Sequence, residues 1–194
     1  MRQKLILTQI FLLFMVITNA QKLTKNEKKI VKNIEQNNAE AISFLEKVVN
    51  INSGTLNLKG IEKVGKEFAT AFEEIGFEST WIPMPEEMNR AGHLFAEIKG
   101  SKGKKLLLIG HLDTVFEEDS PFQTFEMVND SIAHAPGGND MKGGDVIVLY
   151  ALKALKENGL LNDAQIIVAF TGDEESTGDP LEESRKDLIA AAKR

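Results

Sequence analysis

Two unbroken apolar runs constrain the fold of this 194-residue chain more than any other feature. The first is the apolar part, Leu106–Ile109, of the seven-residue run from Lys104 to Gly110, and the second, AQIIVAFT, spans Ala164–Thr171. Short continuous apolar runs are typical of strands that are buried on both faces of a sheet, whereas a half-exposed strand alternates. Because segments with helical periodicity lie before, between and after these runs, the sequence predicts a layered α/β fold.

The helices are predicted from apolar positions that recur every three to four residues. Thr24 and Glu27 form a capping-box pattern, and the helix that follows is expected to end near Asn50. Gly76 stands where a C-cap belongs, after a second helix over 58–75. The other predicted elements are strands over 78–84 and 94–98, a hairpin over 126–133, and helices over 141–158 and 180–194.

The composition excludes several classes of function. The chain has no cysteine, which rules out disulfides, thiolate metal ligands and a cysteine nucleophile. The formal net charge is −6, and no run of Lys and Arg is interleaved with aromatic residues, so a nucleic-acid partner is not expected. The hydrophobic share of 42% and the charged share of 27% are those of an ordinary globular domain.

The N-terminus has the layout of a secretory signal peptide over residues 1–20. Arg2 and Lys4 precede an apolar stretch over 5–17, and small residues stand before a cleavage site after Ala20. The apolar stretch is shorter than the roughly 20 residues that span a bilayer, so a membrane anchor is the weaker interpretation. We therefore expect an exported, periplasmic or secreted protein without a stable membrane anchor, whose domain occupies residues 21–194.

Polar clusters follow both apolar strands and precede one helix. They contain His111 with Asp113, then Asp140, and then Glu174 with Glu175. Each alone has an ordinary structural explanation: a histidine that bonds the backbone, an aspartate that caps a helix, or a solvated charge run. Together they lie where α/β sheets bind ligands, at the carboxyl ends of strands.

Histidine with carboxylates is the donor set expected for zinc or a similar divalent ion. In an extended segment, residues i and i+2 point the same way, so Asp113 is placed to accept the other ring N–H of His111. The adjacent glutamates are able to divide two roles: one carboxylate binds the metal and the other accepts a proton from water. The residues therefore predict a metal site.

The segments GHLDTVF, PGGNDMKGG and GDEES resemble the M20 class of dinuclear zinc carboxypeptidases and deacylases, in the same order. The resemblance implies a layered α/β/α zinc-exopeptidase-like catalytic domain. It further implies that the chain is the N-terminal portion of a metallopeptidase, truncated before the family's inserted lid and dimerisation domain. The family's remaining carboxylate and histidine ligands would come after Arg194.

The resemblance also implies a role for each site residue. His111 would bind one zinc ion, Asp140 would bridge two, and Glu175 would complete the metal ligands present. Asp113 would orient the histidine, and Glu174 would be the general base. A cis peptide between Asp140 and Met141 is implied as well. Two Zn²⁺ ions are expected in a complete site, with Co²⁺ or Mn²⁺ as alternatives.

The function that the resemblance implies is a zinc-dependent exopeptidase of the carboxypeptidase type, which hydrolyses a peptide or amide bond with a metal-activated water. Two alternatives stay open: an N-acyl-amino-acid deacylase of the same family, and a catalytically incomplete metal-binding fragment. The expected substrate is a small peptide or an N-acyl amino acid. A homodimer of the full-length enzyme is a further expectation from the family, and the fragment itself is expected to be inactive.

Overall fold

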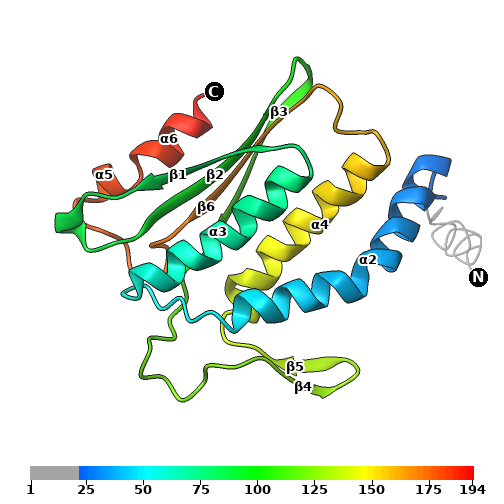
Figure 1. The fold of residues 1–194 in the computed structure, drawn as a ribbon. Helices are drawn as coiled ribbons and strands as arrows, with labels where there is room; N and C mark the ends of the chain where they lie inside the picture. Colours follow the sequence, from blue (N-terminus) through cyan, green and yellow to red (C-terminus); the bar gives the residue numbers. More distant parts are fainter. Residues whose placement is uncertain (1–21) are drawn as a thin grey trace, which may run out of the picture.

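The computed structural model describes residues 22–194, so the predicted signal peptide lies outside the described residues. Its centre is a mixed four-stranded sheet with the strand order β1-β2-β6-β3 (Figure 1). β1 (Glu78–Pro83) pairs antiparallel with β2 (Gly92–Lys99), and β2 pairs antiparallel with β6 (Ala164–Thr171). β3 (Lys102–His111) pairs parallel with β6. The layered α/β fold predicted from the two apolar runs is therefore confirmed.

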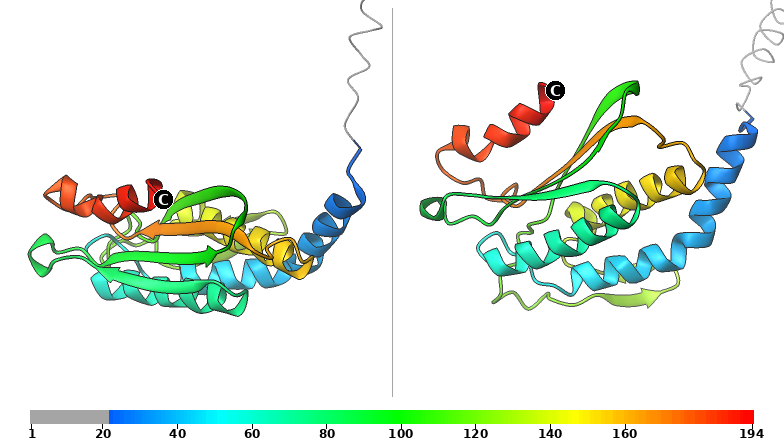
Figure 2. Two further views of the ribbon diagram at one scale, coloured as in Figure 1. Left: turned by 90° about the horizontal axis from the view of Figure 1, so that it is seen from above. Right: turned by 45° about the horizontal axis from the view of Figure 1, so that its top comes forward.

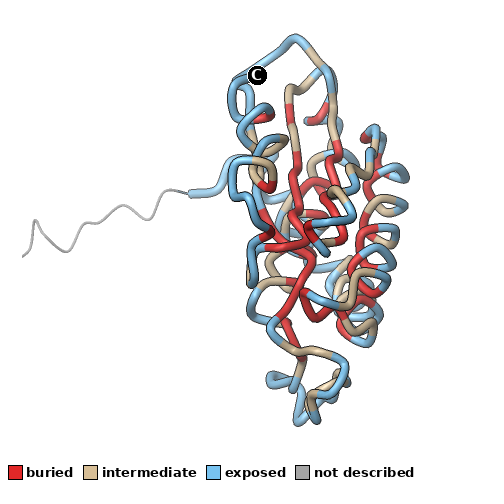
Figure 3. Tube along the Cα trace, turned by 90° about the vertical axis from the view of Figure 1, so that its left-hand side faces the viewer, coloured by how far each residue is buried: buried red, intermediate tan, exposed pale blue. Residues whose placement is uncertain are grey.

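Three long helices lie on one face of the sheet (Figures 1 and 2). They are α2 (Lys25–Val49), α3 (Leu58–Glu74) and α4 (Gly143–Glu157), and the capping box predicted at Thr24 is present. The core lies between these helices and the sheet, where Phe68 and Phe72 of α3 pack against Phe170 with ring centroids 5.3 and 5.7 Å apart. Figure 3 shows the buried residues gathered in the centre of the molecule.

The opposite face of the sheet is covered by a smaller layer, α5 (Leu181–Ser184) and α6 (Lys186–Ala192) (Figure 2). The single helix predicted over 180–194 is therefore wrong, because the chain leaves helical geometry at Arg185, with φ −99° and ψ 0°. At this break the carbonyl of Ser184 bonds the ring of His93, 91 residues away in sequence. The sequence around residue 185 alone does not reveal a contact with a residue so far away in the chain.

β3 differs most from its predicted environment. The apolar run was expected to be buried on both faces, but β3 is an edge strand, and Leu106 and Ile109 are 49% and 54% exposed. The continuous apolar pattern is the same in the central strand β6, where most residues are buried. Hydrophobicity alone therefore did not distinguish a central strand from an edge strand.

The register of the parallel pair places the ends of β3 and β6 together. His111 lies opposite Thr171 and Gly110 lies opposite Phe170. α4 approaches this end of β3 so closely that a Cβ on Gly110 would come within 2.1 Å of a carboxylate oxygen of Asp145. Consequently the chain segments that follow both strands begin at the same edge of the sheet.

The predicted hairpin is present as β4 (Glu126–Asn129) and β5 (Ile132–His134), exposed beside the ends of α2 and α4 (Figure 1). After it comes η2 (Gly138–Lys142), an irregular turn that leads directly into α4. A 3-10 helix, η1 (Glu86–Met88), connects β1 and β2. None of the helices among residues 22–194 combines the length and the apolar content that crossing a membrane requires.

Candidate metal centre

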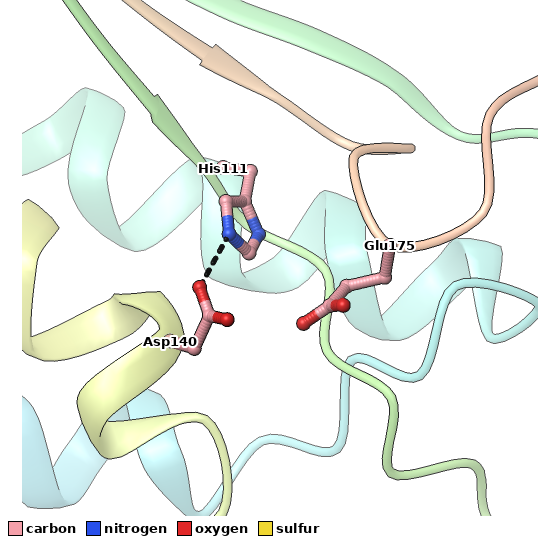
Figure 4. A group of neighbouring side chains, drawn as sticks. All are labelled: His111, Asp140 and Glu175. Carbon is pink, nitrogen blue, oxygen red and sulfur yellow. Dashed lines mark hydrogen bonds and ion pairs between the residues drawn. The ribbon is translucent and has the colours of Figure 1, made fainter.

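Three side chains from separate segments converge at the carboxyl ends of β3 and β6 (Figure 4). His111 ends β3, Asp140 lies in η2, and Glu175 lies in the loop after β6. One ligand atom from each lies within 4.8 Å of the other two. In Figure 4 both carboxylates point toward the space beside the imidazole. The structure thus brings together the three residues predicted to bind metal.

His111 is buried and is held from one side by Asp113. Its Nδ1 lies 3.1 Å from the backbone oxygen of Asp113 and 3.4 Å from the Asp113 carboxylate. Its Nε2 points away from Asp113, 3.0 Å from Oδ1 of Asp140. The contact predicted between ring and carboxylate is present, although the backbone oxygen is the nearer acceptor. This arrangement leaves Nε2 as the ring atom that faces Asp140.

The Asp113 carboxylate has contacts beyond the one with the histidine. It is fully buried and accepts hydrogen bonds from the hydroxyl of Thr55 at 2.8 Å and from the backbone N–H groups of Glu174 and Glu175 at 3.0 Å each. Burial alone would raise the pKa of Asp113, but the bonds from His111, Thr55 and the two N–H groups outweigh burial and lower the pKa. One carboxylate therefore ties the end of β3 to the loop after β6.

The same contacts govern the protonation of the histidine. Burial lowers the pKa of His111, but the hydrogen bond and charge of Asp113, together with the bond to Asp140, outweigh burial and raise the pKa from 6.5 to about 9. A proton on Nε2 and a metal ion compete for the same lone pair. Metal binding at neutral pH therefore has to displace a proton from this ring.

Asp140 reaches the cluster from an irregular turn. Within η2 its dihedral angles are non-helical, with φ −132° and ψ 99°. The Asp140–Met141 peptide bond is cis, which confirms the bond implied by the family resemblance. Gly137 opens the turn with φ 69°, and a Cβ there would come within 2.4 Å of Thr114. Asp140 remains the exposed member of the cluster, with 71% of its side chain accessible.

The two adjacent glutamates occupy different positions. Glu175 is half-buried and belongs to the cluster, whereas the side chain of Glu174 is 56% exposed and its carboxylate lies 3.8 Å from Nε2 of His111. Burial raises the pKa of Glu175, and the nearby carboxylates, Asp140 first among them, act in the same direction against the opposing charge of His111. The geometry favours Glu175 as the ligand and Glu174 as the proton acceptor, and both roles remain predictions.

Two ionisable residues near the cluster are buried, and sequence reasoning missed both. Lys142 donates to the backbone carbonyls of Val48 and Ile51 at 2.9 and 2.8 Å, and burial, opposed by Asp145, lowers the lysine's pKa to about 7. Asp145 is fully buried, and neither carboxylate oxygen has a partner among the described residues. Burial raises the pKa of Asp145 well above its usual value, against the charges of His111 and Lys142, and so favours the neutral carboxyl.

The donor set fits a zinc ion. An imidazole nitrogen and carboxylate oxygens are ligands that zinc takes in proteins, at about 2.0–2.2 Å. Two such ligands of one ion lie roughly 3–4 Å apart, and small side-chain rotations reach this spacing from the observed separations, which lie within 4.8 Å. Cobalt and manganese accept the same donor types. The cluster therefore has the donors that a divalent ion of this group requires.

The comparisons with known proteins concern the part of the chain that carries this cluster. Residues 107–193, which include all five predicted site residues, match the family described as peptidase family M20/M25/M40. Carboxypeptidase G2 of Pseudomonas sp. (strain RS-16) is 36% identical over 139 residues, which is 69% of this chain and 32% of that protein. The family match thus falls on the part of the chain that carries the cluster.

Solved structures show the same fold. The dipeptidase Dug1p of Saccharomyces cerevisiae superimposes with a TM-score of 0.68 and 18% identity, over 84% of this chain and 37% of that chain. The M20 family metallo-carboxypeptidase Sso-CP2 of Sulfolobus solfataricus gives a TM-score of 0.63 and 20% identity, over 78% and 35%. This chain spans about a third of the length of these relatives. The family match, the likeness to carboxypeptidase G2 and the shared fold together place this chain in the M20/M25/M40 family of peptidases.

Proposed function

We propose that this chain carries the metal-binding and proton-transfer residues of a zinc-dependent exopeptidase of the carboxypeptidase type. The observation on which the proposal depends most is the convergence of His111, Asp140 and Glu175 within 4.8 Å, with the Glu174 carboxylate beside them. The similarity to carboxypeptidase G2 supports a carboxypeptidase over the other activities of the family. Two ions bridged by Asp140 remain the expected complement of a complete site.

Each residue has a separate task in this proposal. Zinc held by His111, Asp140 and Glu175 would make a water molecule more acidic and polarise the carbonyl of the scissile bond. Asp113 keeps a ring proton on Nδ1 of the histidine and so leaves the lone pair of Nε2 for metal. These contacts prepare the ligand side of the site before any substrate binds.

Glu174 is the proposed proton carrier. Its carboxylate is exposed beside the cluster and is thus able to reach both water and substrate. It accepts a proton as the water oxygen bonds to the scissile carbonyl carbon. The same proton then passes to the leaving amine as the C–N bond breaks. The products are an amine, here the released amino acid, and a carboxylic acid.

The proposal is tested with the natural protein, zinc and two substrates, a dipeptide with a C-terminal glutamate and an N-acetyl amino acid. We expect chelator-sensitive hydrolysis of the dipeptide, and we expect Glu174→Gln to abolish it while zinc content stays normal. Glu182→Gln, at an exposed glutamate on α5, is the matched control and should keep full activity.

The outcomes separate the candidate functions. Faster turnover of the N-acetyl amino acid would replace the carboxypeptidase with a deacylase. Stoichiometric zinc in the natural protein without turnover of either substrate would leave a metal-binding protein rather than an enzyme. For residues 22–194 alone we expect weak zinc binding and no turnover, because two ions bridged by Asp140 would each keep only two of these ligands, and catalytic zinc usually has three.

A further inference from the structure

The loop after β6 is held by hydrogen bonds along its whole length. This loop, Asp173–Gly178, carries the two glutamates of the site, whose backbone N–H groups donate to Asp113. Arg90 donates to the carbonyl oxygen of Ser176 at 2.6 Å and to its hydroxyl at 3.0 Å. The loop backbone is therefore ordered by contacts within the protein, although the side chain of its first glutamate is exposed.

The first residue of the loop, Asp173, is hydrogen-bonded to the last, Gly178. Its carboxylate is fully buried and accepts hydrogen bonds from the N–H of Gly178 at 2.8 Å and from the hydroxyl of Ser184 at 2.6 Å. Arg185 donates to the same carboxylate at 2.6 Å, and to the Asp173 carbonyl and the Thr177 hydroxyl at 3.2 Å each. A buried carboxylate requires such partners. Arg185 thus balances the negative charge of Asp173 and also holds the backbone at the start of the loop.

This network is anchored in the sheet through His93. The ring of His93 is buried in β2, and its Nδ1 accepts from the N–H of Gly172 at 3.2 Å. Nε2 therefore carries the ring proton and donates to the carbonyl of Ser184 at 3.0 Å. Ser184 ends α5, which lies with α6 on the face of the sheet opposite α3 and α4 (Figure 2). The loop is thus positioned from the face that the long helices leave uncovered.

We propose that Asp173 and Arg185 are positioning residues, whose partly buried ion pair holds Glu175 where it binds metal. Neither residue belongs to the metal cluster, and both act through the backbone of the loop. This inference deepens the proposed function and rests on it. Without the pair, the loop has to be ordered when metal binds. The affinity for zinc should then fall by about 10- to 100-fold, the usual effect of losing a group that orients a ligand.

The test uses the natural protein, as above. The measured quantities are zinc affinity, by competition with a chromogenic chelator, and amide exchange at Glu174 and Glu175 without metal. Arg185→Met should weaken zinc binding about 10- to 100-fold and speed exchange at both amides. Arg185→Lys keeps the charge but has no planar fork, and should restore part of both losses. Lys186→Met is the matched control, because Lys186 is exposed and pairs with Glu183, away from the loop.

A second variant covers the case in which Arg185→Met fails to fold because it leaves a buried carboxylate unpaired. Asp173→Asn with Arg185→Gln removes both charges together and should show the same weaker zinc binding. If the unsubstituted chain binds zinc and both variants keep its affinity and exchange rates, the role assigned to the pair is wrong and the proposed function stands. If the unsubstituted natural protein does not bind zinc, the metal site itself is wrong, and so is the role assigned to the pair.

Discussion

The two sides of the candidate metal centre differ in how firmly the protein holds them. His111 and Asp113 are buried, and the Asp113 carboxylate also binds Thr55 and the backbone of the glutamate loop. Asp140, on the other side, is 71% exposed, and its carboxylate contacts the imidazole. The contrast indicates that folding alone orders the histidine and glutamate side. In the proposed metal site, the aspartate side would become fixed only when metal binds.

Removing the Asp113 carboxylate should have the largest effect on the free energy of unfolding, because this carboxylate holds the ordered histidine and glutamate side together. Asp113→Ala leaves the hydroxyl of Thr55 and two backbone N–H groups without their acceptor. It also removes the carboxylate beside the His111 ring, which keeps its bond to the backbone oxygen of residue 113. The cost in unfolding free energy should be about 3 kcal/mol or more, since several buried donors become unsatisfied together. Urea unfolding of the metal-free chain measures it, and a change below about 1 kcal/mol would mean that these donors find other acceptors.

Removing Asp140 should separate metal binding from folding. Asp140→Ala should abolish zinc binding, because a bridging carboxylate serves two ions. Its exposed side chain should contribute within about 1 kcal/mol to the stability of the metal-free chain. Metal analysis of the purified natural protein with this substitution, together with urea unfolding, checks both statements. Two equivalents of zinc retained by the variant would contradict the bridging role.

The adjacent glutamates give a sharper comparison within one loop. Glu175→Gln should reduce zinc affinity, whereas Glu174→Gln should leave it near normal, because only Glu175 belongs to the compact cluster. The two substitutions are isosteric and keep the backbone bonds to Asp113, so each is the control for the other. If the results are exchanged, the ligand and the base have been assigned to the wrong neighbours.

The last comparison concerns the dependence of stability and zinc affinity on pH. In the folded metal-free chain the pKa of His111 is raised from 6.5 to about 9. The charged ring therefore contributes its full stabilisation below pH 6.5 and loses it as the pH rises to about 9. Thermal unfolding of the chelated chain should show a decline over this interval that His111→Gln removes. Zinc affinity should rise over the same interval as the competing proton leaves, and an affinity independent of pH would contradict the raised pKa.

Much of the cluster could be predicted from sequence because its segments follow strands of one parallel pair. The register that sets His111 opposite Thr171 is what carries the histidine to the glutamates. The buried residues that hold the glutamate loop in place were less predictable. Asp173 gave no sign of being fully buried, since it stands in an acidic run, and its partner Arg185 stands in a predicted helix. Their pairing depends on a helix break that a distant histidine stabilises.

The position of β3 at the edge of the sheet is a second feature that the local sequence did not predict. β3 and β6 have similar apolar patterns, yet their exposure differs because one has a single neighbouring strand and the other has two. The number of neighbours is a property of the whole sheet. A pattern within one strand therefore predicts that the strand exists, and it does not predict where in the sheet the strand lies.

The parallel pairing of β3 with β6 also has a kinetic consequence. Asp113 and Glu175 lie 62 residues apart in sequence, so their contact forms only after a long loop has closed. An unfolded chain has no preassembled set of donors for a metal ion, and an ion that binds only the native state stabilises that state alone. A metal that joins after this closure should therefore slow the unfolding of the chain and leave its folding rate nearly unchanged.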